Sequence, residues 1–249
     1  MKRTALNGIS MLLKDDNLRT LHGWKKVQHI LAYYKFLLLI ICIFAYFIVY
    51  NIYGYLTHKN IILYTALVNV VAGEDLTRQL EGDFLDHLGV DTSKNAMKLY
   101  TNLYLTDDEL SVYHEYTYAS RMKILAILEG KSLDVILMNQ EAFDAFSQNG
   151  YLYDLEQLFS ETDPALYEKI RSDLVYNIVI LEDNANDRIL NKSIPYSALT
   201  EEHAFGLDIS QTPFIRQSGF DESVYLGIAA NSPRLNTVSE YLKYLYEII

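Results

Sequence analysis

The segment MKILAILEGKSLDVILMNQEAFDAFSQNG, residues 122–150, decides the fold. Its first part is a helical stretch that ends at Leu128, and Gly130 supplies the stop that such a helix needs. The run 133–139 is short, apolar and bounded by polar residues, which is typical of a buried strand. Residues 140–150 then have the length and spacing of a short helix. This order of elements predicts an α/β protein whose strands are covered by helices.

The order of strand and helix occurs twice more toward the amino terminus. The apolar run 61–73 predicts a buried strand, and 74–89 carries apolar residues on one helical face. The alternating run 98–105 predicts a second strand, and Thr106 with Glu109 has the spacing of a capping box that begins a helix. Three such units predict a mostly parallel sheet with helices on both faces.

The carboxy-terminal half has a different pattern. Two runs, 174–183 and 188–197, flank the turn-forming sequence NAND, residues 184–187, and predict a β-hairpin. Residues 224–232 predict one more strand, and 236–249 predict a closing amphipathic helix. We find no linker or repeat after residue 57, so 57–249 is expected to form one domain.

A second decisive segment is FLLLIICIFAYFIVYNIYGYL, residues 36–56, which contains no formal charge. As a helix it would be roughly 31 Å long, enough to cross a hydrocarbon core of about 30 Å. A cleaved signal peptide is the alternative, but it would have a shorter apolar core near the amino terminus and a small-residue cleavage site. Here 35 residues precede the core, which favours an uncleaved signal anchor.

Charge is distributed unevenly about this segment. Residues 1–35 hold seven basic and two acidic residues, whereas 57–249 holds 14 basic and 30 acidic ones. The positive-inside rule therefore predicts a single-pass protein of the cell membrane, with a cytoplasmic amino terminus and an extracytoplasmic body. The flank WKKVQHILAYYKF, residues 24–36, is expected to form an interfacial helix or to serve only as positive-inside sequence.

Composition and motifs argue against several classes of function. The net charge of −11 argues against nucleic acid as a partner, and a single cysteine argues against a disulfide framework or a cysteine-rich zinc site. The chain has no phosphate-binding loop, nucleophile elbow or paired-histidine zinc motif. We therefore expect no enzyme activity, no cofactor and no metal.

The segment MKILAILEGKSLDVILMNQEAFDAFSQNGYLYDLEQLF, residues 122–159, resembles the extracellular solute-binding proteins with the type II periplasmic-binding fold. The first lobe of that family runs through a helix, a glycine, Asp-Val-Ile, a short helix and Gly-x-Leu-x-Asp-Leu. The matching positions here are Gly130, Asp134, Val135, Ile136, Gly150, Leu152, Asp154 and Leu155. Residues 204–210 and 223–245 resemble the segment in which the family's chain returns to that lobe, and the anchor with its flank is similar to membrane-tethered relatives in Gram-positive anaerobes.

The chain departs from that family in one important respect. A full binding protein closes two lobes on its ligand, but here only residues 160–203 stand where a second lobe belongs. The resemblance therefore implies one complete lobe with a reduced, hairpin-like remnant of the other. It leaves open whether the chain delivers a ligand to an ABC permease.

The expected ligand site follows from the predicted sheet. The carboxyl ends of parallel strands meet at one edge, where helix amino termini present free N–H groups. Five residues fall there and are the candidate binding residues: Gly73, Glu74, Tyr104, Asn139 and Gln140. The simpler alternative is that Glu74 complements a helix dipole and Asn139 caps a helix.

Two functions remain as hypotheses. The first is an anchored, extracytoplasmic protein that binds a small solute or peptide without chemistry. The second is a single-lobe module, sensory or for interaction with another envelope protein, with no small-molecule ligand.

Overall fold

A computed structural model describes residues 23–24, 27–28, 35–57, 59–212, 215–216 and 223–247. Most of the segment 1–35, which was predicted to be cytoplasmic, and of the interfacial helix predicted over 24–36 lies outside the described residues. The chain divides into two compact units, Met1–His58 and Lys59–Ile249, which we describe separately. We refer to the second unit as the body.

The first unit contains the helix α4, Lys35–Thr57. Its stretch Lys35–Gly54 has a mean hydropathy of 2.4 and is the one helix in the described part of the chain that is long and apolar enough to cross a membrane. Its large side chains are mostly exposed. The predicted apolar helix over 36–56 is therefore confirmed.

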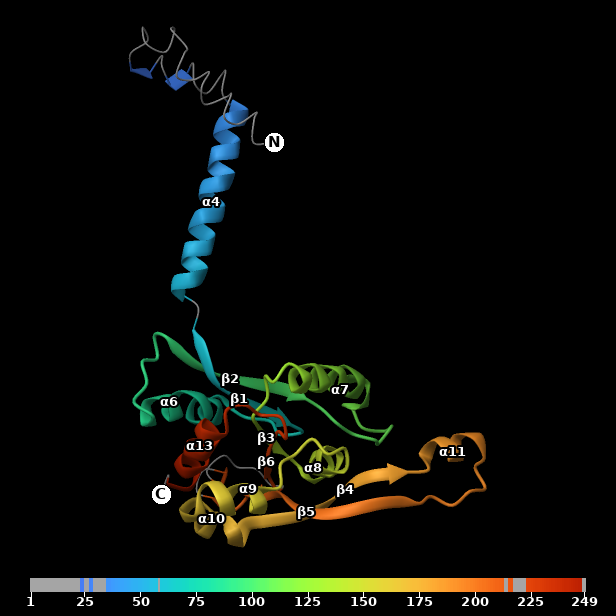
Figure 1. Cartoon of the computed structure of the whole chain (residues 1–249). Coiled ribbons are helices and arrows are strands. Elements are labelled where there is room, and N and C mark those ends of the chain that lie inside the picture. Colours follow the sequence, from blue (N-terminus) through green and yellow to red (C-terminus); the bar gives the residue numbers. More distant parts are fainter. Residues whose placement is uncertain are drawn as a thin grey trace. The chain divides into compact units, whose positions relative to one another are not determined.

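The body is built on a six-stranded sheet in the order β2-β1-β3-β6-β5-β4 (Figure 1). The strands are β1 (Asn60–Val68), β2 (Asn95–Leu103), β3 (Val135–Met138), β4 (Leu174–Asp183), β5 (Ala198–Asp208) and β6 (Tyr225–Ile228). β1 pairs in parallel with both β2 and β3. The pairs β3–β6, β6–β5 and β5–β4 are all antiparallel.

The prediction of a mostly parallel sheet is therefore wrong, and the sheet is mixed. The strand–helix units gave the three parallel strands correctly, because each crossover helix returns the chain to the same edge. β6 runs antiparallel to both of its neighbours, β3 and β5. A short apolar run such as Tyr225–Ile228 indicates burial but carries no information on direction.

Helices cover both faces of the sheet, as predicted. One face lies under α5 (Glu74–Arg78), the π-helical turn η1 (Gln79–Asp83), α6 (Phe84–His87) and the closing helix α13 (Leu235–Glu247). α6 and α13 lie together on one side of the sheet (Figure 1), where Phe84 and Tyr241 meet edge to face with ring centroids 4.8 Å apart. Gly89, with φ +63°, follows this helical segment in the left-handed conformation expected from its sequence.

The other face lies under α7 (His114–Glu129) and α8 (Gln140–Gln148). Phe143 and Phe146 of α8 are almost completely buried against β3 and β6, together with Ile124 and Leu128 of α7. α7 begins at His114, eight residues after Thr106, so the predicted capping box is wrong. The Thr106 hydroxyl instead accepts a hydrogen bond from the backbone N–H of Asp108 within a loop.

Two further helices, α9 (Leu155–Thr162) and α10 (Pro164–Ile170), begin at aspartate caps. Asp154 and Asp163 each accept a hydrogen bond from a backbone N–H of the first turn, and Pro164 fits the first position of α10 because that position needs no N–H. A 3-10 turn, η2 (Arg171–Asp173), leads into β4. Ile170 is fully buried in the main core, so this part of 160–203 packs within the body rather than apart from it.

The predicted hairpin is correct in its first strand and wrong in its second. Residues 185–190 form a short helix, α11, and the returning strand β5 begins only at Ala198. Asn184 closes the connection, since its side chain donates to the Pro195 carbonyl and accepts from the Ser197 N–H. Pro195 has no N–H to give to a strand ladder, which explains why pairing starts after it.

Candidate binding groove at the carboxyl edge of the parallel strands

Asn69 directly follows β1, and its side chain links the segments that follow the three parallel strands. Its φ of 57° is left-handed, a conformation that asparagine tolerates better than most residues. Its amide nitrogen donates to the Leu105 carbonyl (2.6 Å), and its amide oxygen accepts from the Leu105 N–H (2.8 Å). The same nitrogen also donates to Oδ1 of Asn139 (3.0 Å), which directly follows β3. The strand predicted over 61–73 therefore stops at Val68.

Asn139 caps α8, as the simpler alternative proposed. Its Oδ1 accepts from the Ala142 N–H at 3.1 Å, in addition to the bond from Asn69. Gln140 is exposed and donates from Nε2 to Oδ1 of Asp144, one turn later (2.8 Å). These polar atoms hold the first turn of α8 at the edge of the sheet.

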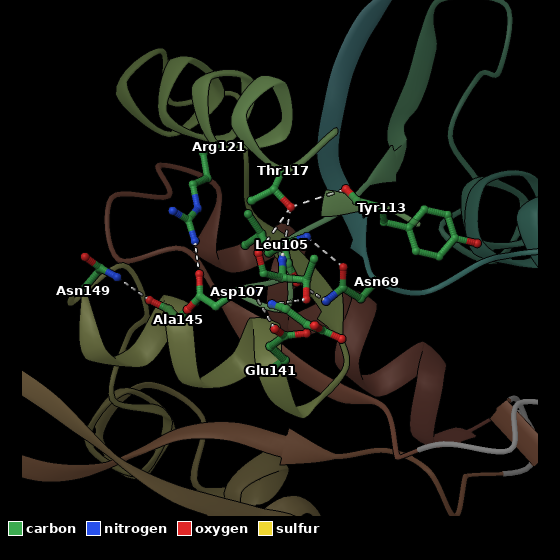
Figure 2. A network of polar contacts seen from close by, with 11 residues as sticks. Asn69, Leu105, Asp107, Tyr113, Thr117, Arg121, Glu141, Ala145 and Asn149 are labelled. Carbon is green, nitrogen blue, oxygen red and sulfur yellow. Dashed lines mark hydrogen bonds and ion pairs between the residues drawn. The ribbon is translucent and has the colours of Figure 1, made fainter. Parts of the chain in front are cut away.

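The loop between β2 and α7 is held by α7 on one side and α8 on the other (Figure 2). Arg121 of α7 pairs with Asp107 at 2.6 Å, and Glu141 of α8 accepts a hydrogen bond from the Asp107 N–H at 2.9 Å. The Thr117 hydroxyl bonds to the backbone of Thr106. This loop has a fixed path because both neighbouring helices contact it through side chains.

A groove of about 510 Å³ lies between α7 and α8 at this loop. Its lining residues are Leu105, Asp107, Arg121, Ile124, Leu125, Glu141, Asp144, Ala145, Phe146, Gln148, Asn149 and Tyr151. Leu105, Ile124 and Phe146 are buried and provide an apolar floor. The rim has three carboxylates and one guanidinium, and the guanidinium of Arg121 already pairs with Asp107. Such a groove suits a ligand with an apolar part and a positively charged group.

None of the five predicted site residues lines the groove. Asn139 and Gln140 contact the polar network beside it, as described above. Tyr104 stacks on Tyr113, with ring centroids 4.2 Å apart and planes 1° from parallel. Gly73 is the N-cap of α5, with open space where a side chain would be, and Glu74 is exposed in the first turn of that helix.

Sequence reasoning missed Asn69, which hydrogen-bonds Leu105 beside the groove, and four residues that line it: Asp107, Arg121, Glu141 and Asp144. Only Asn69 had a usable signal, because a polar residue of high left-handed tendency interrupts the apolar run 61–73. The other four come from a loop and two helices, and their proximity depends on how the helices pack. No group of three or more His, Cys, Asp or Glu side chains among the described residues is arranged to hold a metal ion.

Comparisons with known proteins add no identification. Neither the protein-family models, nor the curated proteins, nor the solved structures gave a match to this chain. The class established by the fold is an α/β protein with a mixed six-stranded sheet and one apolar amino-terminal helix.

Proposed function

We propose that this chain is a single-pass membrane protein whose extracytoplasmic body binds a small solute or peptide, without chemistry, in the groove between α7 and α8. The observation that carries the proposal is the position of this groove beside the carboxyl ends of β2 and β3, the edge at which open α/β sheets usually bind ligands. Its volume is within the range of small-molecule sites. The resemblance to one lobe of a solute-binding protein supports the same function.

The proposed topology rests on α4 and on charge. Residues 1–35 contain seven basic and two acidic residues, and such segments remain on the cytoplasmic side. The body, with 30 acidic and 14 basic residues after position 56, then lies outside. Delivery of the ligand to an ABC permease is a further part of the proposal that the resemblance suggests.

The groove suggests which ligands to test first. Glu141 and Asp144 place carboxylates along one side, and the exposed side chain of Leu125 extends the apolar floor. Amines, basic amino acids and short peptides with a lysine or arginine beside an apolar residue match this surface. Sugars and neutral amino acids serve as the comparison set.

Thermal unfolding of residues 59–249 against this panel tests the proposal. A ligand at 100 times its Kd adds about 2.7 kcal/mol of stability, which for a body of this size raises Tm by roughly 5–10 °C. Filling the groove with Ala145→Phe should remove the shift. Ala126→Phe, on an exposed part of α7 outside the groove, is the matched control and should retain it. A panel without any shift, on a protein that unfolds cooperatively, would contradict solute binding.

A second function, interaction with another envelope protein, is favoured by a separate observation. The ribbon formed by β4, α11 and β5 carries several exposed apolar side chains: Tyr176, Leu181, Ile189, Leu190, Tyr196 and Leu199. Exposed patches of this kind commonly mark interaction sites. A photo-crosslinker at Leu190 in the full chain should then give one discrete adduct, which Ile189→Glu should abolish and the exposed α7 substitution Ala126→Glu should leave unchanged.

A further inference from the structure

Two tyrosines and three cations form a compact group on the face of the sheet that α7 covers. Tyr64 of β1 stacks on Tyr100 of β2, with ring centroids 6.4 Å apart. The guanidinium of Arg234 lies 4.6 Å from the Tyr64 ring centre. The ammonium groups of Lys98 and Lys123 lie 5.3 and 5.6 Å from the Tyr100 ring centre. Each cation is close enough to be attracted by the ring face.

A fourth basic residue, Lys131, adjoins this group through its backbone. Lys131 follows α7 with φ 50°, and its carbonyl accepts a hydrogen bond from Nη2 of Arg234 at 2.5 Å. We call Lys98, Lys123, Lys131 and Arg234 the basic cluster. Its members come from four segments that are distant in sequence: β2, α7, the loop after α7 and the loop before α13.

Three members of the basic cluster carry charge that the body does not neutralise. Arg234 pairs with the buried Asp134. Lys98, Lys123 and Lys131 are exposed, and none of them takes part in an ion pair within the described residues. Five of the body's other cations do have a carboxylate partner: Arg78, Lys94, Arg121, Arg171 and Lys243. The cluster is thus a local positive area on an acidic body.

The connection between α4 and β1 is short. α4 ends at Thr57 and β1 begins at Asn60, so three peptide units span the interval, at most about 11 Å. Tyr64 lies four residues further along β1, roughly 13 Å as extended strand. The backbone of Tyr64 also bonds to Asp134, at the amino end of β3, and thus places Lys131 and Arg234 near the same end of the sheet.

We propose that the basic cluster binds the phosphate-bearing headgroups of anionic lipids in the membrane that holds the chain's own helix. The attraction of lysine to an anionic surface acts within about a Debye length, which the short connection between α4 and β1 provides. The remaining, acidic surface of the body is repelled by the same lipids. The two effects together orient the body with the amino ends of the parallel strands toward the membrane and the α7–α8 groove away from it. This inference rests on the proposed anchoring of the chain by α4, and it is independent of what the groove binds.

The test uses the full chain in vesicles, with Cys42→Ser as background and a nitroxide at Glu129→Cys, next to the cluster. The measured quantity is the collision rate of the nitroxide with a nickel chelate that is attached to a lipid headgroup. Each lysine near an anionic surface changes the ratio of bound to unbound body by about fivefold. Vesicles with three neutral lipids to one phosphatidylglycerol should therefore give a much higher collision rate than neutral vesicles, and 0.5 M salt should reverse the difference.

Two variants of equal charge separate the cluster from net charge. Lys98→Gln, Lys123→Gln and Lys131→Gln together should lower the bound ratio by roughly a hundredfold and bring the collision rate to that in neutral vesicles. Arg188→Gln, Lys192→Gln and Arg216→Gln, all outside the cluster and all exposed, should leave it unchanged. A nitroxide at Val112→Cys, beyond the carboxyl end of β2, should show no dependence on lipid charge. Equal rates in neutral and anionic vesicles, or an equal loss in both triple variants, would overturn the proposal.

Discussion

Asp134 and Arg234 are separated by 100 residues in sequence and form an ion pair of 2.7 Å in the body. The Asp134 side chain is completely buried, whereas that of Arg234 is 23% exposed. The carboxylate also accepts hydrogen bonds from the Ser232 hydroxyl (2.6 Å) and the Tyr64 N–H (2.8 Å). This one side chain therefore ties the start of β3 to β1 and to the loop before α13.

Removal of Arg234 should destabilise the body strongly. Arg234→Ala leaves a buried carboxylate without its counter-ion, and we expect a loss of about 3 kcal/mol, at the lower end for a broken buried pair because Arg234 is partly exposed. Arg234→Lys keeps the charge but loses the second bond, to the Lys131 carbonyl, so its cost should be intermediate. Urea unfolding of residues 59–249 measures both. The exposed Arg216→Ala is the control, and a cost for Arg234→Ala no larger than that of the control would contradict this account.

Asn69 should contribute through both its backbone conformation and its side chain. Asn69→Ala places alanine at φ 57° and removes the bonds to Leu105, for an expected loss of about 2–3 kcal/mol. Asn69→Gly relieves the backbone and should recover roughly 1 kcal/mol of that loss. Chemical denaturation of the two variants separates the contributions. Equal stabilities would mean that the left-handed backbone costs nothing.

Asn139 distinguishes helix capping from ligand binding. Asn139→Ala should cost about 1 kcal/mol through loss of the cap on α8, whereas Asn139→Asp keeps an oxygen acceptor for the Ala142 N–H. If Asn139 acts only as a cap, the Asn139→Asp variant, in which the cap is retained, should bind ligands of the groove as the unmodified body does. A loss of affinity in Asn139→Asp without a loss of stability would instead assign a direct binding role to this residue.

Two glycines should respond differently to a side chain. A Cβ at Gly206 would lie 2.7 Å from the buried ring of Phe143, so Gly206→Ala should cost about 1–3 kcal/mol by overpacking. Gly73 has open space around its Cα and is the N-cap of α5, so Gly73→Ser should be neutral or slightly stabilising. Thermal unfolding of the two variants checks both expectations, and a destabilised Gly73→Ser would show a close approach that the structure lacks.

His203 gives the body a specific pH dependence. The pKa of its imidazole is raised from the ordinary 6.5, mainly by the hydrogen bond to Asp154 and further by Glu201. Because the pKa of His203 is raised in the folded state, the protonated imidazole stabilises the folded body. This contribution to stability is complete below pH 6.5 and is lost as pH rises through the folded pKa. NMR titration of His203 should therefore show a midpoint above 6.5.

Asp154→Asn is the matched variant, because it retains an oxygen that can cap α9. It should lower the His203 midpoint and flatten the pH dependence of unfolding, whereas Glu202→Gln, on the same strand, should do neither. An unchanged midpoint in Asp154→Asn would show that Asp154 does not hold the imidazolium.

The regular elements with strong local patterns were predictable. The uncharged run 36–56 and the closing helix appear within one or two residues of their predicted bounds, and α7 ends one residue after the predicted Leu128, although it begins at His114 and not at Thr106. The failures occur where local sequence leaves the outcome open. Residues 188–197 were predicted as a strand, yet they contain part of a helix and an irregular return whose path depends on Asn184 contacting Pro195 and Ser197.

The residues at the candidate site were also predictable only where a local sequence pattern marked them. Asn139 was found because it follows a buried strand and precedes a short helix, which is a local pattern. Arg121 and Asp107 were missed because their ion pair joins α7 to a loop that was predicted to be helical. Glu141 was missed because its partner, the Asp107 N–H, lies 34 residues away in the chain.

By itself, the sequence determined the apolar helix, the α/β class, the three parallel strand–helix units and the asymmetry of charge about residue 57. Each of these depends on periodicity, composition or caps, which act over a few neighbouring residues. Only the tertiary structure decided the direction of β6, the groove between α7 and α8, and the gathering of the basic cluster around Tyr64 and Tyr100. Those features depend on contacts between distant segments, and such contacts form only when the whole sheet and both helical layers bury their apolar faces together.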